Sequence, residues 1–319
     1  MAVRDIIQAA AGVGGGDAEV FSTYIYTGSG SAQTITNGIN LAGEGGLVWV
    51  KNRTNVVSHR LYDTERGVYK ELYTDLINAQ VDRTSTTAGL SSFNSNGFSF
   101  GNSDYNGTNQ SGINYASWTF RKAPEFFDVV AYTGNGVTDQ AVPHNLTIAP
   151  ELYIMKTIST TGDWWTYTTA IDGTHDYSKL NTTDAFGDSI RPLPDNTNIY
   201  VGASTNTNGA AYIAYLFASC PGVSKIGTYT GTGANIDVDC GFSVGARFVL
   251  IKRTNTTGDW SVWDSVRGIV SGNDPYLLMN SNAAEVNSED DIDPLASGFT
   301  VKSGAFNVSG HNYIFLAIA

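Results

Sequence analysis

Residues 47–51 read LVWVK, and two similar stretches follow further along the chain, LYIMK at 152–156 and FVLIK at 248–252. Each is an apolar run of typical strand length that ends in a lysine. A Tyr-Thr-Gly-x-Gly motif begins 25, 24 and 23 residues before the three lysines. Self-similarity at a nearly fixed period is the mark of a repeat protein, so these stretches predict three copies of one unit.

Further landmarks follow each strand in the same order. Copies two and three share the loop TTGDW, and copies one and three share an Asp-x-x-Arg-Gly turn that begins at Asp63 and Asp264. Copy two carries Thr168 at that spacing. Every copy closes on Asn-x-x-Gly-x-x-Tyr and an apolar strand. These landmarks divide the chain into an N-terminal segment and three repeats, at 1–20, 21–123, 124–220 and 221–319.

The composition predicts an all-β fold. Charged residues make up only 15% of the chain, whereas Gly (35), Tyr (17) and Phe (14) are plentiful. Polar turns between β-branched and aromatic runs are typical of β-architecture. With about six to eight short strands in each copy, we expect three tandem β-sandwich or jelly-roll-like repeats. The short joints between copies predict a stiff rod or a compact cluster.

The first twenty residues differ from the repeats. They predict either a short helix, with the apolar residues Val3, Ile6, Ile7 and Ala10 as its docking side, or an extended tether. A helix this short is unstable in water without a partner surface. We therefore expect the segment to dock either on the chain's own first repeat or on another protein.

The net charge of −12 excludes several classes of partner. Nucleic acid and anionic membranes require clusters of Lys and Arg, and the sequence has none. It also lacks the ~18 continuous apolar residues of a membrane-spanning helix and the pattern of a secretory signal. We expect a protein that folds in a cytoplasm, with no nucleic-acid partner and no membrane insertion. Cys220 and Cys240 allow one disulfide at most.

Residues that carry enzyme chemistry do not recur with the repeats. Nucleophilic catalysis needs a histidine base beside the nucleophile, and no Gly-x-Ser-x-Gly elbow is present. Neither His nor Cys is clustered as zinc requires. We expect no enzyme, no metal and no cofactor. The four histidines stand at different places in their copies: His59, His144, His175 and His311.

Two groups of carboxylates have both a chemical and a structural interpretation. Asp63 with Glu65 is a candidate acid–base pair, but copy three keeps only the aspartate. The favoured interpretation is an Asp–Arg contact within the turn, Asp63 with Arg66 and Asp264 with Arg267. The acidic run at 289–293 offers oxygen ligands for calcium. It lacks a defined ligand spacing, which favours a solvated loop.

Aromatic residues on the return strands offer a platform for sugars. Trp164, Trp165 and Trp263 follow the loops of copies two and three. Rings of this kind bind the apolar face of a glycan when they are exposed, and otherwise pack in a core. For any single ring, core packing is the favoured interpretation, so the three residues are a candidate glycan platform to be located in the structure.

Several phrases resemble a repeat family of tailed-phage virion proteins, common in phages of marine bacteria and cyanobacteria. They are GEGGLVWVK at 43–51, DTERG at 63–67, YASWTFRKAP at 115–124 and FFDVV at 126–130, together with the N-terminal MAVRDIIQAAAG.

The resemblance implies a surface-exposed tail or fibre protein of the virion that docks through its N-terminus on other virion proteins. It also implies assembly in the host cytoplasm, a homo-oligomer within the particle, and contact with a host receptor such as a surface glycan. A head decoration protein and a glycan-binding module are the alternatives. The family supplies no catalytic residues.

Overall fold

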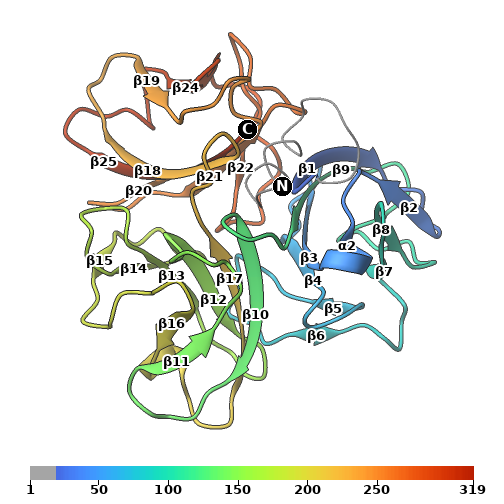
Figure 1. The fold of residues 1–319 in the computed structure, drawn as a ribbon. Helices are drawn as coiled ribbons and strands as arrows, with labels where there is room; N and C mark the ends of the chain where they lie inside the picture. The colour runs from blue at the N-terminus through green and yellow to red at the C-terminus, as the bar shows by residue number, and fades with distance from the viewer. Residues whose placement is uncertain (1–18) are drawn as a thin grey trace, which may run out of the picture.

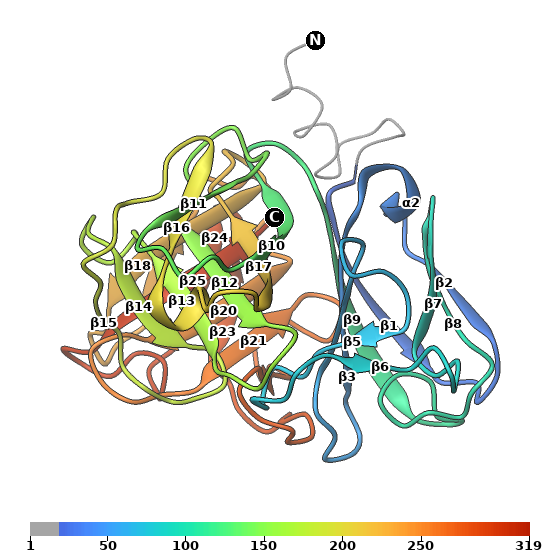
Figure 2. The ribbon, with the colours of Figure 1, turned by 90° about the horizontal axis from the view of Figure 1, so that it is seen from below.

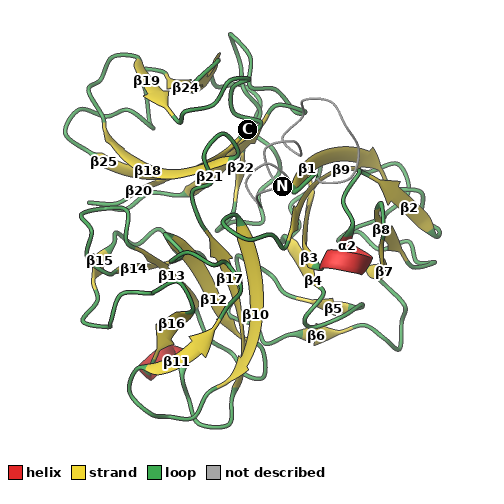
Figure 3. Ribbon diagram, viewed as in Figure 1, coloured by secondary structure: helices red, strands yellow, loops and turns green. Residues whose placement is uncertain are grey.

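The computed structural model describes residues 19–319, and their regular secondary structure is almost entirely antiparallel β-strand (Figure 3). This confirms the predicted all-β fold class. Within the described residues, no helix is long and apolar enough to cross a membrane. The strands fall into three successive units, coloured blue to teal, green to yellow, and orange to red in Figure 1.

The first unit is built from two sheets that face each other. The larger has the order β1-β9-β3-β4 and the smaller has the order β2-β8-β7. A short hairpin of β5 and β6 and the helix α2 complete the unit. The bounds are β1 (Phe21–Thr27), β2 (Gln33–Thr36), α2 (Leu41–Glu44), β3 (Gly46–Asn52), β4 (Arg60–Asp63), β5 (Lys70–Glu71), β6 (Val81–Asp82), β7 (Leu90–Asn94), β8 (Gly97–Phe100) and β9 (Asn114–Arg121).

The second unit repeats this plan with a longer main sheet. Its strand order is β10-β17-β12-β13-β14-β15, and β11 pairs with β16 in the small sheet. The bounds are β10 (Phe127–Thr133), β11 (Gln140–Pro143), β12 (Leu152–Thr157), β13 (Trp164–Thr168), β14 (Asp176–Lys179), β15 (Gly187–Asp188), β16 (Asn198–Val201), the 3-10 turn η1 (Ala203–Thr205) and β17 (Ala211–Phe217).

The third unit has the main sheet β18-β25-β20-β21-β22 and the small sheet β19-β24-β23. In all three units the first strand therefore pairs with the last, and the last pairs with the strand that carries the lysine. The bounds are β18 (Ser224–Thr230), β19 (Ile236–Asp239), β20 (Phe248–Arg253), β21 (Trp260–Asp264), β22 (Leu277–Leu278), β23 (Ile292–Leu295), β24 (Gly298–Val301) and β25 (Asn312–Ile318).

The opening and closing motifs of each copy meet across the main sheet. Tyr26 lies opposite Tyr115 in the register of β1 and β9, with their rings stacked 5.1 Å apart. Beside them, the closing Asn109 accepts a hydrogen bond through Oδ1 from the Ser29 backbone N–H, in the turn where Gly30 has a φ of 70°. The same stacked pair recurs as Tyr132 with Tyr212 and as Tyr229 with Tyr313. The opening and closing motifs of each copy thus contact each other and hold the ends of the unit together.

The three main sheets turn one face toward a single shared core. Trp118, Trp164 and Trp260 lie in this core, although they belong to three different units. The opposite face of each main sheet packs on the unit's small sheet and forms a separate core. The units surround the shared core as a compact cluster (Figures 1 and 2), which decides between the predicted rod and cluster.

The strand lysines tie the units into a closed ring. Lys156 Nζ donates to the Ile77 carbonyl of the first unit at 2.9 Å, and Lys252 Nζ donates to the Thr183 carbonyl of the second at 3.0 Å. Lys51 Nζ donates to its own Asn52 carbonyl at 2.7 Å and points toward the Asn282 carbonyl of the third unit at 3.4 Å. All three lysines are buried. Each therefore uses its ammonium group to hold a neighbouring unit.

A second ring of hydrogen bonds comes from the residue eight positions after each lysine. Trp164 Nε1 donates to the Tyr73 carbonyl at 2.7 Å, and Trp260 Nε1 donates to the Lys179 carbonyl at 3.1 Å. The first unit has His59 here, and its Nε2 lies 2.9 Å from the Leu278 carbonyl. Burial holds the pKa of His59 well below its usual value, so the ring is neutral. Because Nδ1 accepts from Trp49, Nε2 carries the proton that is donated.

Candidate functional site

One position on the return strand differs sharply between the units. It lies opposite Val50, Met155 and Ile251 in the three hairpins, and it is occupied by Arg60, Trp165 and Ser261. Side chains alternate along a strand, and the preceding Trp164 and Trp260 face the shared core. The position therefore faces each unit's own interior, where a large side chain fills space and a small one leaves it open.

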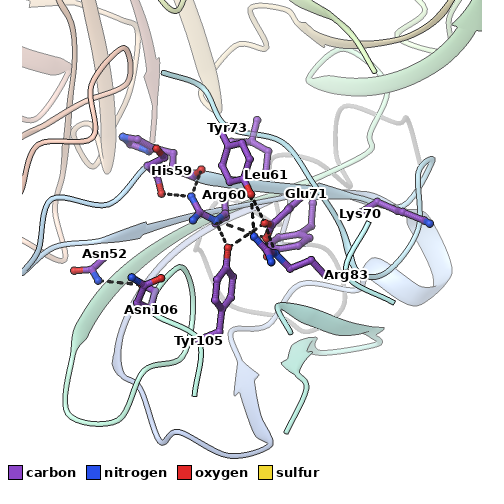
Figure 4. Close-up of polar contacts among 12 residues, drawn as sticks. Asn52, His59, Arg60, Leu61, Lys70, Glu71, Tyr73, Arg83, Tyr105 and Asn106 are labelled. Atoms are coloured by element: carbon purple, nitrogen blue, oxygen red, sulfur yellow. Dashed lines mark hydrogen bonds and ion pairs between the residues drawn. The ribbon is translucent and has the colours of Figure 1, made fainter. Parts of the chain in front are cut away.

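In the first unit, Arg60 fills this space as part of a polar cluster (Figure 4). Its Nε donates to the Tyr105 hydroxyl at 2.9 Å, and its guanidinium lies over the Tyr73 ring, 4.3 Å from the centroid. The buried Glu71 is the centre of the cluster, and it accepts hydrogen bonds from Arg83 and from the hydroxyls of three tyrosines. These tyrosines are Tyr62, Tyr73 and Tyr105.

The cluster behaves as a satisfied polar core. Burial, reinforced by the nearby Glu71 carboxylate, raises the pKa of Tyr62 well above its usual value. The hydroxyl therefore stays protonated and donates. With two arginines beside one carboxylate and three tyrosine hydroxyls donating to it, the arrangement stabilises the first unit.

In the second unit the same position opens a small cavity of about 300 Å³. Trp165 lines it together with Tyr177, whose ring lies 5.8 Å away, and with Arg191. Lys179 Nζ lies 5.4 Å from the centre of the Trp165 ring, and Arg191 forms an ion pair with Asp139 at 3.2 Å.

In the third unit, Ser261 leaves a cavity of about 430 Å³. The cavity lies between the main sheet and the loops that carry residues 289–291 and 303–306. Aromatic rings, one guanidinium and four carboxylates line it beside Ser261. They are Tyr276, Phe306, Tyr313, Arg253, Asp259, Glu289, Asp290 and Asp291.

Several polar atoms of this cavity have no hydrogen-bond partner within residues 19–319. They are Ser261 Oγ, on a fully buried residue, Asp291 Oδ2, on a residue that is 9% exposed, and Arg253 Nε. Buried polar atoms nearly always have a partner in native proteins. Burial, together with Glu289, Asp274 and Asp290, raises the pKa of Asp291 to about 6. The cavity therefore has the unmet polar groups of a ligand site.

The three predicted platform tryptophans do not share one exposed surface. Trp164 and Trp263 are fully buried, which agrees with the favoured interpretation of core packing and leaves neither ring open to a sugar. Trp164 is buried because its indole N–H bonds to a neighbouring unit. Trp263 is packed 4.8 Å from Phe306, behind the cavity of the third unit. Trp165 alone is half-buried and lines a cavity.

The turn carboxylates have structural partners. Arg66 Nε donates to Asp63 Oδ2 at 2.6 Å, and Arg267 Nε donates to Asp264 Oδ2, which confirms both predicted Asp–Arg contacts. Glu65 instead accepts from Lys122 Nζ at 2.9 Å. The buried Asp63 and the exposed Glu65 thus have separate partners and do not form an acid–base pair.

The remaining predicted features lie apart from the cavity or at its edge. Lys302 pairs with Asp293 at 2.8 Å and with Asp290 at 3.6 Å, and among residues 19–319 no group of three or more His, Cys, Asp and Glu is arranged to hold a metal. Cys220 and Cys240 are buried in different core clusters and are not bridged. The predicted docking residues Val3, Ile6, Ile7 and Ala10 lie outside the described residues.

Sequence reasoning did not single out Arg60, Glu71 or Ser261. The repeat itself held a signal for Arg60 and Ser261, since both stand nine residues after the strand lysine, where copy two has a tryptophan. For Glu71 there was none, because β5 and β14 follow their lysines at different distances and carry unrelated residues.

Comparison with known proteins adds a family and no activity. No curated protein matches the chain. One family model, described as a domain of unknown function, matches residues 17–319 and so covers all three units. The chain belongs to this family, DUF7483.

Proposed function

We propose that the protein is a non-enzymatic structural component of a bacteriophage virion, exposed on the particle as part of a tail or fibre. It docks through its N-terminal segment on other virion proteins and is repeated within the particle as a homo-oligomer. The proposal rests on the resemblance of the repeat phrases to tailed-phage virion proteins, and on one structural observation, the closed ring of buried contacts between the units.

The ring supports this proposal because it accounts for the residues that recur. Lys51, Lys156 and Lys252 recur in all three copies, and each bonds to a neighbouring unit. Groups that catalysis needs do not recur in this way. The copies share the residues that join the units, whereas their cavities differ. Such a chain is suited to rigid display on a particle, because the contacts between units stabilise the assembly while the surface of each copy can change.

Electron microscopy of phage particles from the encoding genome tests the proposal. An antibody against residues 21–319 should label purified virions, and a tail or fibre component predicts label at the tail. Label spread over the capsid would instead support a head decoration protein. Particles without label, and without peptides of this chain in mass spectrometry, would overturn the structural role.

Binding of a host glycan is a second candidate function, and the cavity of the third unit favours it. Glycan sites combine an aromatic surface with hydrogen-bonding groups in a hollow. Three aromatic residues border this cavity beside Ser261 Oγ and Asp291 Oδ2, which have no hydrogen-bond partner among the described residues. A glycan array probed with the full chain tests this function, and the absence of any bound glycan would count against it.

A further inference from the structure

The cavity of the third unit exists because one residue is small. At the equivalent register, Arg60 closes the first unit and Trp165 narrows the second, whereas Ser261 leaves about 430 Å³ open. The hairpin around this position is the same in the three units, since each return strand pairs with its lysine strand in the same register. At this register the cavity of the third unit is therefore larger than that of the second, which is about 300 Å³.

The charge of the lining selects the kind of ligand. Four carboxylates border the cavity against one guanidinium. Three of the carboxylates have partners, because Asp259 accepts from Asn280 at 2.7 Å, Glu289 accepts from Ser288 at 3.2 Å, and Asp290 pairs with Lys302. Asp291 Oδ2 has none among the described residues and lies in the field of Glu289. An anionic ligand would add to this repulsion, whereas a protonated amine would relieve it.

The other lining groups are complementary to a ligand that has hydroxyl groups and an apolar face. Ser261 Oγ can donate or accept, and Arg253 Nε can donate. Arg253 is fixed in place because its Nη2 donates to the Ala305 carbonyl at 2.8 Å, and its guanidinium lies 5.6 Å from the Tyr313 ring centre. Tyr276 and Phe306 add aromatic surface, which suits both cations and the C–H face of a sugar.

We propose that this cavity binds an amino sugar, with the ammonium group on the carboxylate of Asp291 and the hydroxyls on Ser261 and Arg253. The inference deepens the glycan-binding candidate, on which it rests, by naming the class of ligand and the residue that admits it. Ser261 is the specificity-determining residue, because a larger side chain at its register narrows the space, as Trp165 does in the second unit.

Isothermal titration calorimetry of the full chain at pH 7 tests the inference with three probes. Glucosamine carries the amine, N-acetylglucosamine has it blocked, and glucose lacks it. We expect glucosamine to bind at least tenfold more tightly than the other two, since a hydrogen bond to a charged group is worth about 1.5–3 kcal/mol. Asp291→Asn should weaken glucosamine binding at least tenfold and leave glucose unchanged.

Ser261→Trp is the matched variant, because the second unit already carries tryptophan at this register. It should keep the wild-type melting temperature and abolish glucosamine binding. If it fails to fold, Asp291→Asn decides alone. Equal binding of glucosamine and glucose would overturn the amino-sugar inference but leave glycan binding standing. Absence of binding by all three probes, or glucosamine binding unaffected by Asp291→Asn, would overturn the site itself.

Discussion

The indole Nε1 of Trp118 donates a hydrogen bond to Asp264 Oδ2 over 3.0 Å, although 146 residues separate them in the sequence. Trp118 lies on the closing strand of the first unit, and Asp264 begins the Asp-x-x-Arg-Gly turn of the third. The equivalent turn of the first unit has the same kind of partner, because the Tyr215 hydroxyl of the second unit donates to Asp63 at 2.8 Å. Each turn carboxylate thus accepts a hydrogen bond from a side chain of a neighbouring unit.

The second unit has lost this turn, and its neighbour has lost the donor. Trp118 and Tyr215 lie opposite Trp49 and Ile154 in their sheets, and the residue at that register in the third unit is Leu316. A leucine cannot donate a hydrogen bond. In the second unit, Thr168 stands where the turn carboxylate would accept such a bond, and its Oγ1 donates instead to the Glu151 carbonyl at 2.7 Å. The departure of copy two from the motif therefore has a physical reason.

Breaking this junction is the first prediction. Asp264→Thr removes one of the two carboxylates that pair with the buried Arg267, which keeps Glu285 at 3.1 Å, and we expect a loss of about 1.5–3 kcal/mol in the free energy of unfolding. Trp118→Phe removes the indole donor, and it should cost less in the Asp264→Thr variant than in the wild type, because the acceptor is already gone. Urea denaturation of the wild type, the two single variants and the double variant measures this difference. An equal cost of Trp118→Phe in both backgrounds would contradict the pairing.

The indole bonds between units give a second prediction. Trp164→Phe keeps an aromatic ring but leaves the buried Tyr73 carbonyl without its 2.7 Å donor, so we expect a loss of about 1–3 kcal/mol in unfolding free energy. Trp165→Phe is the control, because this neighbouring ring is half-buried and lines a cavity. Equal destabilisation by the two changes, in the same thermal or urea experiment, would show that the hydrogen bond is not the cause.

The buried lysines predict a rise of stability with pH. Burial lowers the pKa of Lys252 from 10.5 to about 8. Between these values the unfolded chain holds more protons than the folded one, so this lysine makes the free energy of unfolding increase with pH, by up to about 1.4 kcal/mol per pH unit. Comparison of the wild type with Lys252→Met cancels the other titrating groups. The free energy of unfolding of the wild type should rise relative to that of the variant from pH 8 to pH 10. If the two free energies change in parallel with pH, the prediction is refuted.

The polar cluster of the first unit gives a fourth prediction. Glu71→Gln removes the charge that Arg83 and Arg60 face in a buried site, and we expect a loss of about 3–5 kcal/mol in unfolding free energy. Asp82→Asn is the control from the partner strand of the same hairpin, where the carboxylate is exposed and pairs with Lys70. That change should have little effect. Chemical denaturation that ranks the two variants the other way would exclude Glu71 as the centre of the cluster.

The division between what could and could not be predicted follows distance in the chain. The strands around the three lysines, the glycine turns and the Asp–Arg contact depend on residues a few positions apart or on period-two alternation, both of which are visible in sequence. The pairing of Tyr26 with Tyr115 was within reach, because both belong to motifs that recur at constant spacing. The candidate site was not, since its lining comes from 253 to 313 in separate loops.

The sequence by itself determined the all-β class, the strands and the turns that define each copy, because these follow from local spacing and residue type. Tertiary structure decided how the copies meet. Whether Trp164 faces a sugar or a neighbouring carbonyl, and whether the register of Arg60, Trp165 and Ser261 is filled or hollow, depends on which sheet faces pack together. That packing closes a ring between residues as far apart as Lys51 and Asn282, and no local pattern encodes it.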